Sequence, residues 1–421
     1  MQANSSKRRQ CGAMIITAAL ILLFLLGFMG IALDFGHLFV VKTELQTAVD
    51  SCALSAAREL DGQGTAITRA TSAGQTAGNA NRVNMQSSTW SGQGQIVAAD
   101  ITFRDASYAV TTTPALARYA QCTHTQPNIN IWLMKAMGAF SGDTAGNPAT
   151  RSVAASAVAT RASAQSACPI PVAAKPKTGG VAPNYGFVVG EWVTLIMAQN
   201  AAAGGQIGWA NLDGSNSASE TEAELNGRCG AKVGDTIGTP GVQTSVADVW
   251  NQRFGIYKNT SDPSTARPDY TGYAYTSLNW PAQFNAYNGP SPGSGTGQNY
   301  LTKRAAFASC ADTGTKVKGA NSCESITGLS LNSFQKLANP GNIAGGHMQY
   351  GLDRRFVTVP VIDGGNHVID YLCMLMLQPL SIPMTDVQLE FLGNAGAAGS
   401  PCTTSGLAGG SAGPLVPVLV R

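Results

Sequence analysis

An uncharged apolar run near the amino terminus constrains this chain more than any other feature. Residues Ala13 to Leu33 contain no charged side chain, and as an α-helix they would extend for about 31 Å at ~1.5 Å per residue. The hydrocarbon core of a bilayer is about 30 Å thick. Residues 13–33 are therefore predicted to cross a lipid bilayer once, and no later stretch is long and apolar enough to cross again.

The charges that flank this run predict its orientation. Three cations precede it and the first acid follows it: Lys7, Arg8, Arg9 and then Asp34. The positive-inside rule predicts that residues 1–11 are cytoplasmic and that the chain after the span is exported. A cleaved signal peptide is the alternative, but the run is longer than a signal-peptide core and a helical pattern continues beyond it.

This helical pattern is a stripe of six residues at three- and four-residue steps: Leu38, Val41, Leu45, Ala48, Cys52 and Ala56. Such spacing marks one face of an α-helix, and Gly62 is suited to end it. Residues 12–62 are predicted to form a transmembrane helix with a periplasmic extension. The sequence leaves two interpretations of the stripe open: a docking face for similar helices, which is the role we predict for it, or a face that packs on the chain's own domain.

Charge and turn residues predict the rest of the architecture. Only 12 % of residues are charged and the net charge is +3, with Lys and Arg scattered singly, so no nucleic-acid partner is predicted. The fold class is α+β. Residues 63–167 are predicted to form a small α+β domain, with strands in "GQIVAADITF", "ASYAVTTTPAL" and "ATRSVAASAVATRASA". The Pro- and Gly-rich stretch "CPIPVAAKPKTGGVAP" marks a boundary.

Residues 168–421 are predicted to form a larger, mostly-β exported domain with helical insertions. Short strands alternate with Gly-rich turns, and helices are expected at "TEAELNG" and "SVADVWNQRFG". "RRFVTVPVID" and "VIDYLCMLMLQ" are predicted to pair as a hairpin across "GGNH". Pro360 in the first arm indicates an edge strand or a bulge.

Cysteine usage is typical of an exported protein. Of nine cysteines, Cys11 lies at the predicted membrane edge and the other eight follow the span. Disulfides are favoured over zinc, because the sequence has no CxxC pair and only four histidines. The predicted bonds are Cys310–Cys323, which closes a short polar loop, and Cys52–Cys122, which would staple the helix to the first domain. Cys373, in an apolar strand, could instead be a buried thiol.

Catalytic signatures are missing from the sequence. It has no nucleophile elbow, phosphate loop or dinucleotide fingerprint, so the chain is predicted not to be an enzyme and to need no cofactor. The stretch "DGSNS" is a candidate metal site through Asp213, Ser215 and Ser217, because this spacing occurs where von Willebrand A domains bind a divalent cation. The alternative is a polar turn.

The N-terminal stretch resembles the TadE/TadG-type proteins of Tad (Flp) pilus assembly, in particular TadG-like members. The resemblance rests on Gly12 before the apolar run, on "ALD" at its end, on the helix "LQTAVDSCALSAA" and on the missing prepilin glutamate. Cys52 departs from the family pattern, which has alanine there.

The resemblance implies a structural or assembly component in a bacterial inner membrane, with periplasmic domains that could reach the surface with the pilus. Its implied partners are other pilus-assembly or pilin-like proteins, in a homo- or hetero-oligomer. The alternative function is a surface adhesin or minor-pilin-type tip protein that binds an extracellular ligand.

Overall fold

The computed structural model describes residues 11–84, 95–135, 138, 142, 149–197, 203–240, 244–293, 297–308, 310, 316–338 and 346–420. The chain divides into two compact units. Unit 1 comprises Met1–Arg161 with Pro417–Arg421, and unit 2 comprises Ala162–Val416. The long helix and the first small domain, expected as separate segments, therefore belong to one unit, and the last residues of the chain return to it.

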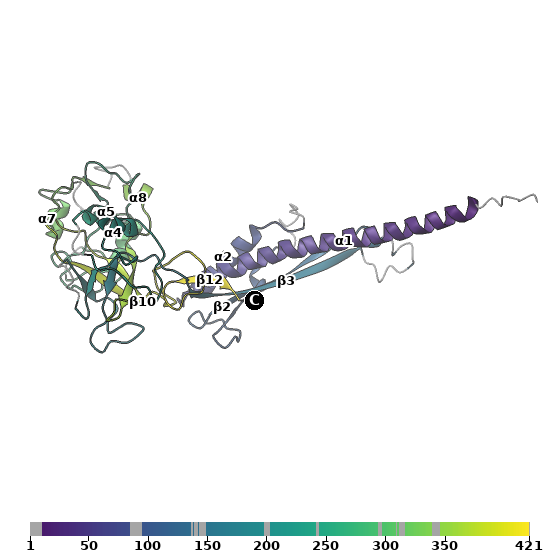
Figure 1. The fold of residues 1–421 in the computed structure, drawn as a ribbon, viewed down its shortest axis with the longest axis horizontal. Helices are drawn as coiled ribbons and strands as arrows, with labels where there is room; N and C mark the ends of the chain where they lie inside the picture. The colour runs from purple at the N-terminus through teal and green to yellow at the C-terminus, as the bar shows by residue number, and fades with distance from the viewer. Residues whose placement is uncertain are drawn as a thin grey trace, which may run out of the picture. The chain divides into compact units, whose positions relative to one another are not determined.

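Unit 1 is built on helix α1, Cys11–Arg58, which continues without interruption from the apolar run into the chain that follows it. A second helix and a four-stranded sheet in the order β1-β2-β3-β12 complete the unit. The remaining elements are α2 (Ala66–Asn79), the 3-10 turn η2 (Ala98–Asp100), β1 (Ile101–Arg104), β2 (Tyr119–Asn130), β3 (Thr150–Ser163) and β12 (Leu415–Leu419). Figure 1 shows α2, β2 and β3 lying along the C-terminal half of α1.

The sheet of unit 1 differs from its prediction at one strand. The expected strands at β1 and β3 are present, but "ASYAVTTTPAL" forms turns with a single bridge between Arg104 and Val110. Its place is taken by β2, which pairs antiparallel with both neighbours, for example Cys122 with Ile101 and with Ala157. The sheet is thus centred on a strand that the hydrophobic pattern did not reveal.

Unit 2 contains a closed barrel with the strand order β10-β11-β5-β6-β4-β9. Its strands are β4 (Val172–Ala174), β5 (Trp192–Ile196), β6 (Ile207–Trp209), β9 (Phe356–Ile362), β10 (Val368–Met376) and β11 (Val387–Asn394). The pairs β5–β6 and β4–β9 are parallel and the others are antiparallel. Leu372, Met374 and Met376 of β10 belong to the main apolar core, whereas Cys373 and Leu375 pack in clusters on the other face.

The predicted hairpin is β9 and β10, and Pro360 pairs with Tyr371 inside it. The expectation of an edge strand is wrong, because β9 has β10 on one side and β4 on the other. A register shift does occur in this hairpin, between Val368 and Asp370 of β10.

Short helices and one small sheet lie outside the barrel strands of unit 2. They are α4 (Ala218–Leu225), α5 (Val246–Gln252), α6 (Tyr300–Ala306), α7 (Cys323–Thr327), α8 (Gly346–Tyr350), β7 (Ile256–Tyr257) and β8 (Lys336–Leu337). The predicted helices at "TEAELNG" and "SVADVWNQRFG" correspond to α4 and α5. Unit 2 is strand-rich but carries more helix and irregular chain than a mostly-β domain.

All eight cysteines after the apolar run are disulfide-bonded. The predicted bonds Cys52–Cys122 and Cys310–Cys323 are both present. The other two are Cys168–Cys229 and Cys373–Cys402, so Cys373 is not a free thiol. Cys52–Cys122 links α1 to β2 and closes a long loop in unit 1, with 70 residues of sequence separation. A loop of that length is expected to add about 4 kcal/mol to stability.

Candidate functional site at the end of the apolar helix segment

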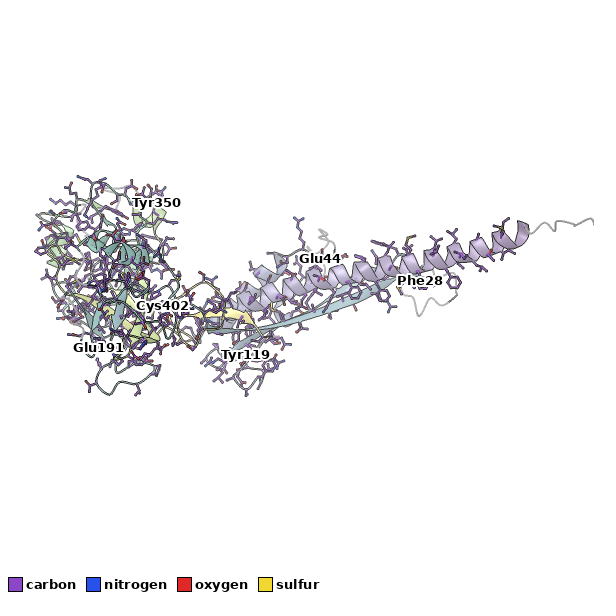
Figure 2. The ribbon with its side chains drawn as sticks, in the orientation of Figure 1. Phe28, Glu44, Tyr119, Glu191, Tyr350 and Cys402 are labelled. Atoms are coloured by element: carbon purple, nitrogen blue, oxygen red, sulfur yellow. A yellow bond between two sulfur atoms is a disulfide. The ribbon has the colours of Figure 1, made fainter. Side chains whose placement is uncertain are left out.

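The N-terminal half of α1 presents an almost continuous apolar surface. Its large side chains are exposed from Met14 to Val40, with Phe28 at 69 %. Figure 2 labels Phe28 on this half and Glu44 on the half that packs on the unit. Among the described residues, α1 is the one helix long and apolar enough to cross a membrane, and its most apolar 18-residue window has a mean hydropathy of 2.7.

Asp34 lies where this apolar half meets the folded half, and it is almost completely buried. Its carboxylate accepts hydrogen bonds from the backbone N–H groups of Trp132 at 3.3 Å, Leu133 at 2.9 Å and Met134 at 2.6 Å. These N–H groups lie at the start of a helical turn and have no acceptor within it. A carboxylate is a strong hydrogen-bond acceptor for such groups. Asp34 therefore joins the end of the apolar half of α1 to the chain that follows β2.

Three further contacts stabilise this junction. The imidazole of His37 stacks on the Trp132 indole with ring centroids 5.2 Å apart, and its Nε2 lies 3.2 Å from Asn84 Oδ1. A side chain at Gly30 would place its Cβ 2.9 Å from the Leu133 Cβ, so glycine permits the close approach. Trp132 remains 61 % exposed. Tryptophan is enriched at membrane–water interfaces, which fits its position beside the end of the apolar surface.

The six-residue stripe is placed in the interior of unit 1. Val41, Leu45, Ala48, Cys52 and Ala56 are each 0 % exposed and belong to one apolar cluster, and Leu38 packs at its edge. They face α2 and the sheet, where small residues allow close packing: a Cβ added at Gly78 would lie 3.1 Å from the Cys52 Cβ. The prediction that these residues form an open docking face is corrected accordingly, because the chain's own elements cover them.

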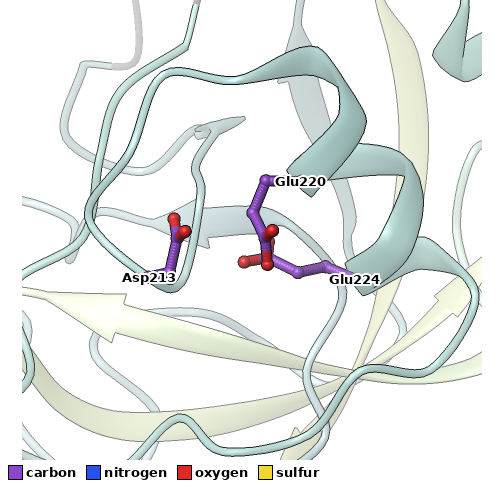
Figure 3. Close-up of side chains that lie close together, drawn as sticks. All are labelled: Asp213, Glu220 and Glu224. Carbon is purple, nitrogen blue, oxygen red and sulfur yellow. The ribbon is translucent and has the colours of Figure 1, made fainter.

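The candidate metal residues of "DGSNS" are not brought together as a metal site. The Asp213 Oδ1 accepts the backbone N–H of Ser215 at 2.9 Å, and the Ser217 hydroxyl contacts that of Ser219, as in the turn interpretation. Asp213 instead approaches Glu220 and Glu224 of α4 (Figure 3). Sequence reasoning missed these two acids, although their four-residue spacing on a predicted helix was a usable signal.

The environment of Glu224 favours its neutral form. Burial raises the pKa of the Glu224 carboxyl to about 7, and the nearby carboxylates of Glu220 and Asp213 act in the same direction. The backbone N–H of Leu212, which donates to Glu224 Oε1 at 2.9 Å, and the backbone N–H of Asp213 oppose this shift only in part.

Comparison with known proteins addresses the N-terminal helix directly. Residues 12–59 match the family model Tad, described as putative Flp pilus-assembly TadE/G-like. The TadE/G-like segment coincides with α1, Cys11–Arg58, and so contains the apolar half, Asp34 and the buried stripe. The match supports a role as a pilus-assembly component, and the helix fits a membrane-anchored protein. Searches of curated proteins and of solved structures found no match.

Proposed function

We propose that this chain is a membrane-anchored structural component of a Tad (Flp) type pilus-assembly machine and that it is not an enzyme. The observation that carries the proposal is that the TadE/G-like match and the helix α1 share almost the same bounds. One helix therefore supplies both the anchor and the central core element of unit 1.

The proposed topology is that of a single-pass inner-membrane protein. Residues 13–33 lie in the bilayer, the N-terminus is cytoplasmic, and both folded units are periplasmic. Four disulfides after the span support an oxidising compartment for these units. At the exit of the helix, Asp34 fixes the segment around Trp132 to α1, so the anchor and the folded part of unit 1 are coupled through hydrogen bonds.

The proposed partner contacts follow from what the fold leaves exposed. Because the stripe around Ala48 is buried, partner helices would meet α1 through its apolar half, where exposed side chains can pack against other membrane helices as well as lipid. Other pilus-assembly proteins would contact the outer surfaces of the exported units. Removal of the anchor would then release the protein from the machine without unfolding unit 2, which contains its own core.

Cell fractionation tests this proposal. Pili are sheared from intact cells and pelleted, inner membranes are prepared from the same cells, and both are probed with an antibody against unit 2. We expect the protein to stay with the membranes and to leave them only on addition of detergent. A cytoplasmic protein and the major pilin serve as fractionation controls.

Recovery of most of the protein in the sheared filaments would contradict the proposal. That distribution would favour the alternative, a surface adhesin or minor-pilin-type tip protein, whose exported part travels with the pilus.

A further inference from the structure

Three carboxylates of unit 2 converge at one side of a cavity of about 410 Å³. Asp213 comes from the turn after β6, and Glu220 and Glu224 come from one face of α4, as Figure 3 shows. One oxygen of each lies within 4.8 Å of the others. Like charges four residues apart on a helix repel each other, and a third acid beside them adds to the repulsion. Arg228, which pairs with Glu220, offsets part of this repulsion, and a cation bound among the three groups would offset more of it.

Glu224 supplies a second, independent observation. The residue is only 3 % exposed, and its Oε2 is buried with no hydrogen-bond partner. Its Oε1 accepts the Leu212 backbone N–H, and its carboxylate group lies beside those of Glu220 and Asp213 (Figure 3). An unsatisfied buried carboxylate oxygen carries a large desolvation cost. The fold therefore holds a buried oxygen without a hydrogen-bond partner on the carboxylate that lies beside the other two acids.

The nearby arginine does not satisfy this atom. Arg228 pairs with Glu220 Oε1 from an exposed position, with 59 % of its own side chain accessible. It leaves Glu224 Oε2 without a donor. Because the Arg228 side chain is largely accessible while that of Glu220 is only 14 % accessible, a cation that binds Glu220 would displace Arg228 into solvent and replace its charge. Glu220 is then free to take a different counter-charge.

The distances fit a calcium ion. Calcium is bound by oxygen ligands at about 2.3–2.6 Å, so two ligand oxygens on opposite sides of one ion lie roughly 4.6–5.2 Å apart, and others lie closer. The three carboxylates satisfy this limit, and the cavity has room for the water molecules that complete six to eight ligands. Magnesium demands a smaller, more regular octahedron and is a poorer fit to acids of mixed burial.

We propose that Asp213, Glu220 and Glu224 form a calcium site in unit 2, with Glu224 as the buried ligand. Cys229 lines the same cavity, and its disulfide to Cys168 fixes that wall. Bound calcium would connect the turn after β6 to α4 and so stabilise this side of the unit. The site would act whether or not the chain takes part in pilus assembly.

Calcium-dependent stability of the purified full-length chain in detergent tests this site. After dialysis against EGTA, the thermal midpoint of unit 2 is followed by tryptophan fluorescence as CaCl₂ is added. We expect the midpoint to rise and to saturate, with half the effect at 0.1–1 mM, roughly the affinity range of extracellular calcium modules. Magnesium at equal concentration is expected to give less than half of this rise.

Variants locate the effect. Glu224→Gln is expected to raise the calcium concentration for half the effect at least tenfold, and Asp213→Asn, at an exposed residue, at least threefold. Glu222→Gln on the same helix, outside the cluster, is the matched control and should behave as wild type. A wild-type midpoint that does not respond to calcium would overturn the proposal, as would equal responses from wild type and both cluster variants. Asp213→Asn keeps the test decisive if Glu224→Gln does not fold.

Discussion

Replacement of Ala48 by glutamate is expected to unfold unit 1. Ala48 is completely buried in the apolar cluster between α1, α2 and the sheet, and its backbone carbonyl lies close to Gly78 of α2. A glutamate there would bury an unpaired carboxylate and would also force α1 and α2 apart. Each effect alone is costly, and together they are expected to exceed about 4 kcal/mol.

Disulfide formation gives a direct measurement of this effect. Cys52 lies one helical turn after Ala48 and bonds to Cys122 of β2, so a misfolded unit 1 would leave both thiols open to alkylation. Thr47→Glu is the matched control, because Thr47 is exposed on the same turn. If the Ala48→Glu variant formed the disulfide and resisted protease like wild type, the stripe would not be buried in unit 1. That result would support the interpretation of the stripe as a docking face.

Replacement of Arg355 by methionine is expected to cost unit 2 about 3–5 kcal/mol. Arg355 is fully buried. Its guanidinium donates to the carbonyl oxygens of Met376 at 2.7 Å and Tyr273 at 2.7 Å, with longer bonds to Thr271 and Leu377. Burial lowers the pKa of Arg355, and the methionine removes that desolvation cost. Several buried carbonyls would nevertheless lose their donors, and this loss is the larger effect.

The thermal midpoint of unit 2 measures this loss in the full-length protein. A change of 1 kcal/mol shifts the midpoint by roughly 2–4 °C in a unit of this size, so a fall of about 10 °C is expected. Arg267→Met is the control, because Arg267 is exposed and its Nε donates to a single carbonyl, that of Tyr350. A fall of less than about 3 °C for Arg355→Met would show that the carbonyls find other donors.

The sequence predicted those elements whose pattern is local and apolar. The continuous helix, the strand β3 and the hairpin of β9 and β10 each carry long runs with clear periodicity. Strand β2 was missed because its inward positions include His124 and Gln126, which are buried yet polar. His124 Nδ1 is accommodated by Asp100 Oδ2 at 2.9 Å, a contact that no hydrophobic pattern shows.

The closed barrel, the burial of the stripe and the contacts of Asp34 could not be predicted from the sequence, because they arise from residues far apart in the chain. Strands β4 and β6 have three residues each, too few for a periodic signal, and β4 pairs with β9 from the far end of the unit's sequence, Ala174 with Val361. For the stripe on α1, an open and a buried face require the same residues, so the sequence could not decide between them. Asp34 was visible as the acid after the apolar run, but its partners lie about a hundred residues later.

Pilus assembly in the native host tests the central claim most directly. A strain that lacks this chain is complemented with the wild type, with Thr47→Glu or with Ala48→Glu, and surface pili are counted by electron microscopy. We predict that the deletion strain has at least tenfold fewer pili, that wild type and Thr47→Glu restore them, and that Ala48→Glu does not. Normal piliation in the deletion strain would contradict the account of this chain as a pilus-assembly component.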